Sequence, residues 1–190
     1  MENKLLALIA GFFAMAFVVT SYFVRKKSLY LLFQALCIVF LIISYFFNVQ
    51  FFAMIGLAVG LFRSLTFYAF EKKEKNAPIY WSFIFSLLTL ASYFIVNFGI
   101  LKTAQPLDIL CLISLCLYAF IFRIRNLKIV RFTMLFPTFL AILFNVLTEA
   151  AIFVTLSYVF ELCANIVSIF KFHVFNKKED KKEEKTLQNK

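Results

Sequence analysis

The chain has few of the residues from which metal sites and β-barrels are built. Its 190 residues include one histidine, four glycines and three prolines, and no stretch alternates polar with apolar residues, so a transmembrane β-barrel has no support. The cysteines lie inside apolar stretches, without a CxxC pair or a Cys/His cluster, and they are Cys37, Cys111, Cys116 and Cys163. We therefore expect thiols that act as small hydrophobic groups, and no metal site.

Catalytic and nucleotide-binding motifs are absent as well. The sequence contains no HExxH, no paired aspartates and no Ser/His arrangement, so we expect neither an enzyme nor a bound cofactor. It also lacks a P-loop, so the driving force of any transport would be a gradient. A retinal protein would need a lysine deep in the last apolar run, whereas Lys171 lies at the inner end of that run.

Apolar residues make up 63% of the chain, and most of them fall in seven runs. A helix needs roughly 20 residues to cross the hydrocarbon layer, where it satisfies its own backbone. The runs reach or approach this length, and they are Leu5–Val24, Ser28–Phe47, Phe51–Phe70, Ile79–Phe98, Leu107–Phe122, Ile129–Leu147 and Ala150–Phe172. The sequence therefore predicts an all-α membrane protein with seven transmembrane helices. The first run is expected to be retained, because no basic cluster precedes it and no A-x-A site follows it.

Basic residues occur in every second gap between the runs. Three basic residues follow the first run and three follow the third. Four lie around the gap after the fifth run, the last of them Arg131, and seven lie at the end of the chain, from Lys171 to Lys190. The opposite side has only Lys4 and Lys102. By the positive-inside rule the basic gaps are cytoplasmic, so the N-terminus is outside and the C-terminus cytoplasmic. The net charge of +10 then indicates attraction to anionic lipid rather than to nucleic acid.

The order of the gaps also predicts an internal repeat. Two units of three helices are parallel when one further helix separates them, and the basic gap at Arg25 recurs at Arg123, an offset of 98 residues. Side chains at this offset are rarely identical, so the repeat is inferred from topology. We expect a 3+1+3 arrangement in which residues 5–70 are the first repeat, 79–98 the linker helix, 107–172 the second repeat and 173–190 a charged cytoplasmic tail.

Two residues of opposite charge lie inside apolar runs, Arg63 in the third and Glu161 in the seventh. They are one repeat offset apart, so we expect them to face each other across a central pathway. A guanidinium in hydrocarbon needs a partner. Glu161 is the predicted partner, and snorkelling of Arg63 to the inner headgroups is the alternative. Three roles stay open for the pair: a clamp between the repeats, a site for a zwitterionic or polar solute, and proton coupling.

Other polar residues lie at the same level and are predicted to bind substrate with this pair: Gln34, Ser64, Tyr158 and Asn165. Each of them alone is also typical of hydrogen bonding between membrane helices. Gly56 and Gly60 form a GxxxG pattern, which indicates close helix packing. Pro137, in the middle of the sixth run, is the predicted hinge. Solvation is expected towards the outer ends of the runs, at Asn97, Asp108, Asn145 and Glu149.

Three stretches carry a resemblance to a known family: GFFAMAFVVTSYFVRKKSLYLLFQAL (residues 11–36), LFRSLTFYAF (61–70) and FRIRNLKIVRF (122–132). They resemble the YgjV family of bacterial inner-membrane proteins. That family is similar in plan to the SWEET and PQ-loop transporters and to PnuC-type vitamin transporters, which implies a 3+1+3 solute pathway. SWEET-like proteins place an asparagine in the third and seventh helices. Here Asn165 matches the second position, whereas the third run offers Arg63 or Phe67, and of the SWEET prolines only Pro137 is present.

These observations favour a small transporter or facilitator of polar solutes in the bacterial inner membrane. It would work by alternating access between the two repeats. The expected partners are membrane lipids and a small polar solute, and no nucleic acid. The second hypothesis is a structural or regulatory membrane protein that binds lipid or a partner subunit. Solute, coupling ion and oligomeric state, including a homo-oligomer, stay open.

Overall fold

The structure is a computed structural model that describes residues 2–47, 51–100, 106–148 and 152–175. In this part of the chain there are seven α-helices and no strand, and a π-helical segment follows the fourth and the seventh helix. The elements are α1 (Glu2–Phe23), α2 (Lys27–Phe47), α3 (Phe51–Lys72), α4 (Ile79–Phe94), η1 (Ile95–Ile100), α5 (Asp108–Ile121), α6 (Leu127–Leu147), α7 (Ile152–Ile169) and η2 (Phe170–Phe175). Each predicted apolar run corresponds to one of these helices.

Six of the described helices are long and apolar enough to cross a membrane, and α5, with 14 residues, is shorter. At 1.5 Å per residue, α5 is about 21 Å long, against about 30 Å of hydrocarbon. The prediction of an all-helical, multi-pass protein is therefore confirmed. The count of seven crossings stays a prediction.

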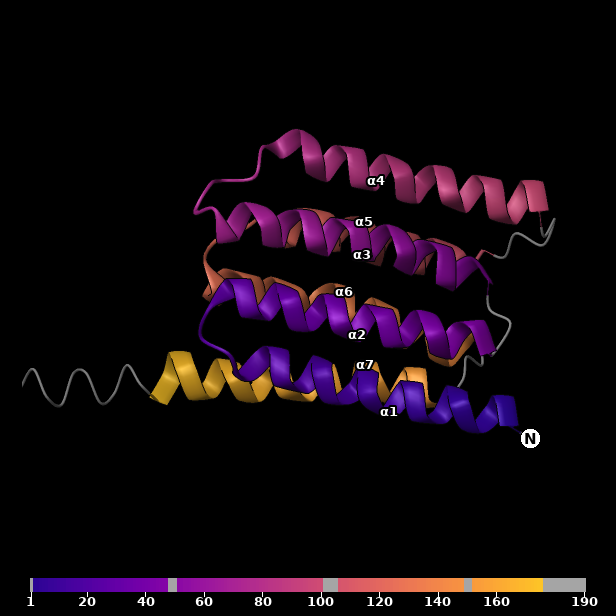
Figure 1. Ribbon diagram of the computed structural model, residues 1–190, viewed down its shortest axis with the longest axis horizontal. Helices are drawn as coiled ribbons and strands as arrows, with labels where there is room; N and C mark the ends of the chain where they lie inside the picture. Colours follow the sequence, from indigo (N-terminus) through magenta and orange to yellow (C-terminus); the bar gives the residue numbers. More distant parts are fainter. Residues whose placement is uncertain (1, 48–50, 101–105, 149–151, 176–190) are drawn as a thin grey trace, which may run out of the picture.

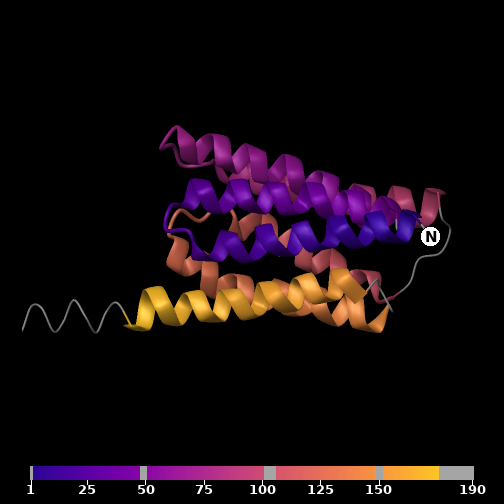
Figure 2. The same ribbon diagram turned by 60° about the horizontal axis from the view of Figure 1, so that its bottom comes forward.

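The helices form two layers of three, and α4 lies along one edge (Figure 1). In the first layer α2 packs between α1 and α3, and in the second α6 packs between α5 and α7. At one edge α1 packs against α7, and at the other α4 contacts both α3 and α5. Figure 2 shows α1 beside α7 from another direction. The helices of the two layers fall within the predicted repeats, residues 5–70 and 107–172, and their relationship as repeats stays a prediction.

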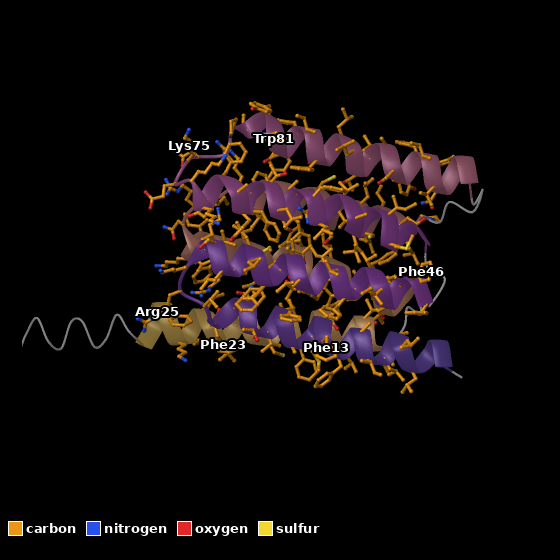
Figure 3. All side chains as sticks on the ribbon, viewed as in Figure 1. Phe13, Phe23, Arg25, Phe46, Lys75 and Trp81 are labelled. Carbon is orange, nitrogen blue, oxygen red and sulfur yellow. The ribbon has the colours of Figure 1, made fainter. Side chains whose placement is uncertain are left out.

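Successive helices run in opposite directions, so the connections gather at two ends of the bundle (Figure 1). The turns after α1, α3 and α5 lie at one end, which we call the basic end, together with η2. Arg25 and Lys75 are at this end in Figure 3, and Phe46 is at the opposite end, near the N-terminus. The basic gaps are thus brought together as the alternation of charge predicts.

The outer surface of the bundle is made of large apolar side chains. Phe62 is 67% exposed, and Phe13 and Phe23 point away from the helices in Figure 3. Small or polar side chains such as Ala14 and Ser64 are buried instead. A water-soluble protein has the opposite distribution, whereas a surface that faces lipid tails has this one.

Pro137 lies within α6, which continues across it from Leu127 to Leu147. The Ser114 hydroxyl of α5 donates a hydrogen bond to the Pro137 carbonyl oxygen at 2.9 Å. This contact ties the middle of α6 to its neighbour in the same layer. The role of Pro137 as a hinge stays a prediction.

Candidate functional site

A small cavity of about 40 Å³ lies between the two layers, midway along the helices. We call it the central cavity. Its wall comes from α2, α3, α5 and α7, so both layers contribute to it. The lining residues are Gln34, Cys37, Ile38, Leu41, Leu57, Arg63, Leu115, Tyr118, Phe122, Tyr158 and Glu161. Arg63 and Glu161, which the sequence predicts at one central pathway, therefore line one cavity.

Arg63 is 3% exposed, and its Nη1 donates a hydrogen bond to the Leu115 carbonyl oxygen of α5 at 2.8 Å. Its guanidinium also lies over the rings of Tyr118 and Phe122, 5.6 and 5.2 Å from their centroids. A Cβ atom on Gly60 would be 3.4 Å from Nη2, so the side chain folds back over this glycine. Gly60 therefore makes room for the guanidinium.

This direction decides against snorkelling. Helix side chains point toward the N-terminus of their helix, and α3 ends at the basic end of the bundle. The Arg63 guanidinium therefore points away from that end and into the protein. The alternative in which Arg63 reaches the inner headgroups is wrong.

Glu161 of α7 is 4% exposed and takes its hydrogen bond from the opposite layer. The hydroxyl of Tyr22, close to the end of α1, donates to its Oε1 at 2.7 Å. A hydrogen bond to a carboxylate is among the strong ones. It fixes the position of the carboxyl group on the cavity wall.

The predicted direct pairing of Arg63 with Glu161 is wrong. No nitrogen of Arg63 lies within the 4.0 Å of an ion pair from the Glu161 carboxyl group; the ion pairs among the described residues join Glu71 to Lys27 at 3.4 Å and to Arg125 at 3.9 Å. The arrangement of the layers explains this. Helix α3 lies at the edge next to α4 and α5, and α7 lies at the other edge next to α1. The two residues thus approach the central cavity from diagonal corners.

The remaining predicted site residues divide into two groups. Gln34 and Tyr158 line the central cavity, and the Gln34 amide donates to the Ser21 hydroxyl at 3.1 Å. Ser64 and Asn165 are buried but do not line it. The Ser64 hydroxyl bonds to the Gly60 carbonyl of its own helix, and the Asn165 amide donates to the Arg131 carbonyl. A substrate-binding role for these residues stays a prediction.

Arg131 lies in a buried environment, whereas the charge pattern predicts a cytoplasmic one. The charge pattern counts it among the cytoplasmic basic residues, yet it is 2% exposed within α6. Its Nη2 donates to the carbonyl oxygens of Tyr22 at 3.0 Å and Val24 at 2.9 Å, and its guanidinium lies 4.7 Å from the ring centroid of Phe172. The last carbonyls of a helix lack partners within the helix and attract cations. Arg131 therefore caps α1 from the opposite layer.

Three aromatic residues that sequence reasoning missed close the central cavity toward the basic end. We call Tyr22, Tyr30 and Phe122 the aromatic plug. Ring centroids are 5.5 Å apart between Tyr22 and Tyr30 and 6.0 Å apart between Tyr30 and Phe122, both edge to face. All three side chains are fully buried. They lie near the basic ends of α1, α2 and α5, on the side of the cavity that faces that end, and Phe122 is part of the cavity wall.

A second cavity of about 30 Å³ lies beyond Tyr158, toward the opposite end. It shares Leu57, Leu115, Tyr118 and Tyr158 with the central cavity, and Tyr45 and Asn145 are also part of its wall. The solvated environment expected for Asn145 is wrong, because its side chain is buried and donates to the Ala141 carbonyl at 2.8 Å.

The same expectation is wrong for Asn97 and Asp108. Both are buried, and the Asn97 amide donates to Asp108 Oδ2 at 2.8 Å. A polar side chain away from water needs a hydrogen bond, and each supplies it for the other. Glu149 lies outside the described residues.

The model of a family described as a bacterial inner membrane protein, Imp-YgjV, matches residues 5–176. The chain belongs to the YgjV family. Its location is therefore the bacterial inner membrane, as a multi-pass protein. No curated protein and no solved structure matches the chain. In the described part of this YgjV-family protein, no three His, Cys, Asp or Glu side chains lie close enough to hold a metal ion.

Proposed function

We propose that the protein is a transporter or facilitator of a small polar solute. The observation that carries this proposal is the central cavity, which lies between two helix layers and is lined by two buried residues of opposite charge that do not pair with each other. A clamp between layers would bring the two charges together, because a direct ion pair compensates their desolvation best. Charges held apart on a cavity wall are suited to a polar ligand instead.

The proposed membrane plan has seven crossings in a 3+1+3 arrangement, with the N-terminus outside. Its support is the collection of the basic gaps at one end of the bundle, which would be cytoplasmic by the positive-inside rule. Helix α5 would cross as part of the second layer, packed between α4 and α6. Its shortness would be accommodated by local thinning of the bilayer.

The proposed mechanism is alternating access by rocking of the two layers about the central cavity. The aromatic plug would be the cytoplasmic gate, and the second cavity would belong to the outer path. A plan like that of SWEET-type and PnuC-type transporters, which the sequence resemblance implies, would work by the same mechanism. No ATP site is needed, so a solute or ion gradient would drive the cycle. The protein is proposed not to be an enzyme.

The competing candidate is a structural or regulatory membrane protein that binds lipid or a partner subunit. The modest size of the central cavity favours it: a water needs roughly 10–15 Å³, so the 40 Å³ cavity has room for about three water molecules. In that case the polar residues would stabilise the bundle without binding a solute.

A two-step experiment decides between these candidates. Purified protein is first screened by thermal unfolding against sugars, nucleosides, vitamins and amino acids, because a ligand of the folded state raises the melting temperature. Each stabilising compound is then tested by counterflow in proteoliposomes, with protein-free liposomes as the control. Stabilisation and counterflow by the same compound are expected. Absence of counterflow for every compound would favour the structural candidate.

A further inference from the structure

We infer that the ligand of the central cavity is a small zwitterion, with an acidic group that binds Arg63 and an ammonium group that binds Glu161. This inference rests on the proposed function and narrows its polar solute to one chemical class. Amino acids and short amino-carboxylates are its simplest members.

The first argument is the unused hydrogen-bonding capacity of Arg63. Its guanidinium has five N–H donors, and the protein accepts one of them through the Leu115 carbonyl. Nε is buried, and no atom among the described residues accepts its hydrogen bond. A buried donor without a partner is costly, and the guanidinium is part of the cavity wall. A carboxylate in the cavity would supply the acceptor and the opposite charge.

The second argument is that the carboxyl group of Glu161 belongs to the same wall. Tyr22 donates a short hydrogen bond that holds it in place, and the Gln34 side chain on the same wall also bonds to it. A carboxylate has lone pairs for about four hydrogen bonds. An ammonium group provides donors and positive charge for those that remain.

The third argument excludes simpler solutes. An anion paired with Arg63 would share a small cavity with the Glu161 carboxylate, and an amine would share it with the guanidinium. Both are repelled in a low-dielectric interior, where charges interact strongly. A neutral sugar would compensate neither charge. When Glu161 is ionised, only a ligand that carries both charges at separate atoms satisfies both sides of the wall.

The small size of the site limits the ligand to a short zwitterion. The central cavity of about 40 Å³ suits the charged groups, and the adjoining cavity of about 30 Å³ shares four wall residues with it. A short side chain could extend past Tyr158 toward Tyr45 and Asn145. We therefore expect alanine-sized ligands to bind better than large aromatic amino acids.

The test compares zwitterions with analogues that lack one charge. Thermal unfolding of the wild-type protein is measured with the standard amino acids, β-alanine, propionate, ethylamine and propionamide at equal concentrations. At least one small zwitterion should bind about tenfold or more tightly than every analogue, as expected for a charge-assisted hydrogen bond. Binding of a singly charged or neutral analogue as strong as that of every zwitterion would overturn the inference.

Two variants then test the assignment of the charges. In Glu161→Gln only the guanidinium keeps its charge, so the tightest-binding compound should change from the zwitterion to propionate. In Arg63→Gln only the carboxylate keeps its charge, so the tightest-binding compound should change to ethylamine. The matched controls Glu74→Gln and Lys128→Gln change exposed charges at the basic end and should leave the preference unchanged. An unchanged preference in both cavity variants would overturn the assignment. The wild-type comparison needs no variant, so it decides even if a variant fails to fold.

The two proposals can fail separately. If a sugar or nucleoside binds and shows counterflow while no zwitterion binds, the zwitterion inference fails and the transport proposal stands. If zwitterions stabilise the protein but no compound shows counterflow, the site is a ligand site and the transport proposal fails.

Discussion

The hydrogen bond from Tyr22 to Glu161 offers the most direct measurement of the interaction energy within the central cavity. Tyr22→Phe removes one hydroxyl from a fully buried ring and leaves the volume almost unchanged. A hydrogen bond to a charged group contributes about 1.5–3 kcal/mol, and one between neutral groups about 0.5–1.5 kcal/mol. With an ionised Glu161, the free energy of unfolding should fall by about 1.5–3 kcal/mol. For a chain of this size, that lowers the melting temperature by roughly 3–12 °C.

The assay is a double-mutant cycle on purified protein. Glu161→Met keeps most of the side-chain volume and removes the acceptor, so Tyr22→Phe should cost little when it is combined with Glu161→Met. The difference between the cost of Tyr22→Phe in the wild type and in the Glu161→Met variant is the coupling energy of the pair. A coupling above about 1.5 kcal/mol indicates a charged Glu161, and a smaller one indicates a protonated carboxyl group.

Tyr30→Phe is the control, because the buried Tyr30 hydroxyl neighbours the Tyr22 hydroxyl and does not itself bond to Glu161. Both tyrosines belong to the aromatic plug, so both variants change the plug by one oxygen atom. Removing a hydroxyl that does not bond to the carboxyl group should cost less than Tyr22→Phe does. Equal losses in Tyr22→Phe and Tyr30→Phe, or the same Tyr22→Phe loss with and without Glu161→Met, would refute the reasoning.

Two further predictions concern packing and topology. Gly60→Val should lower the free energy of unfolding by about 1–3 kcal/mol through overpacking, because the Arg63 guanidinium lies over this glycine. Gly99→Val should change it by less than about 0.5 kcal/mol, since a Cβ there meets nothing within 4 Å. Thermal unfolding measures both variants. A single cysteine at position 73 should react with an impermeant maleimide only from the cytoplasmic side. A single cysteine at position 102 should react only from the outer side. Labelling of both from one side would contradict the proposed crossings.

The helices could be predicted from the sequence because their signal is local. Each apolar run needs only its own length to become a helix in lipid, and the basic gaps needed only the alternation of direction to meet at one end. Arg63 and Glu161 were expected at one pathway, and both line the central cavity, whereas the repeat itself stays a prediction. Their separation could not be predicted, because it depends on which helices occupy the edges of the layers.

Side chains that act across the layers left weaker signals. Arg131 was counted with the loop charges, although it already lay inside the predicted run Ile129–Leu147, and that position was the sign of a buried role. Tyr22 and Tyr30 had no signal at all, since tyrosines near the ends of membrane helices are common at the lipid interface. Their contacts depend on tertiary packing.

Tyr22 connects the charge of the central cavity to the closure of the basic end. Its hydroxyl bonds to Glu161, and its carbonyl oxygen accepts from Arg131. Any rocking that separates α1 from α6 at this end must break the bonds of Arg131 to α1. Arg131→Gln shortens the donor and removes its charge, so it should favour opening of the aromatic plug.

Cys37 can report that opening, because it is buried and lines the central cavity. In a background where the other three cysteines are alanine, we expect Arg131→Gln to raise the rate at which a water-soluble maleimide labels Cys37 from the basic end. Lys128→Gln removes an exposed charge one turn earlier in α6 and should leave the rate unchanged. Slow labelling in Arg131→Gln, equal to that of the parent, would show that the bonds to α1 do not hold the plug closed. Fast labelling would make Arg131 part of the gate, because Arg131 bonds to Tyr22, and Tyr22 also holds the Glu161 carboxyl group in place.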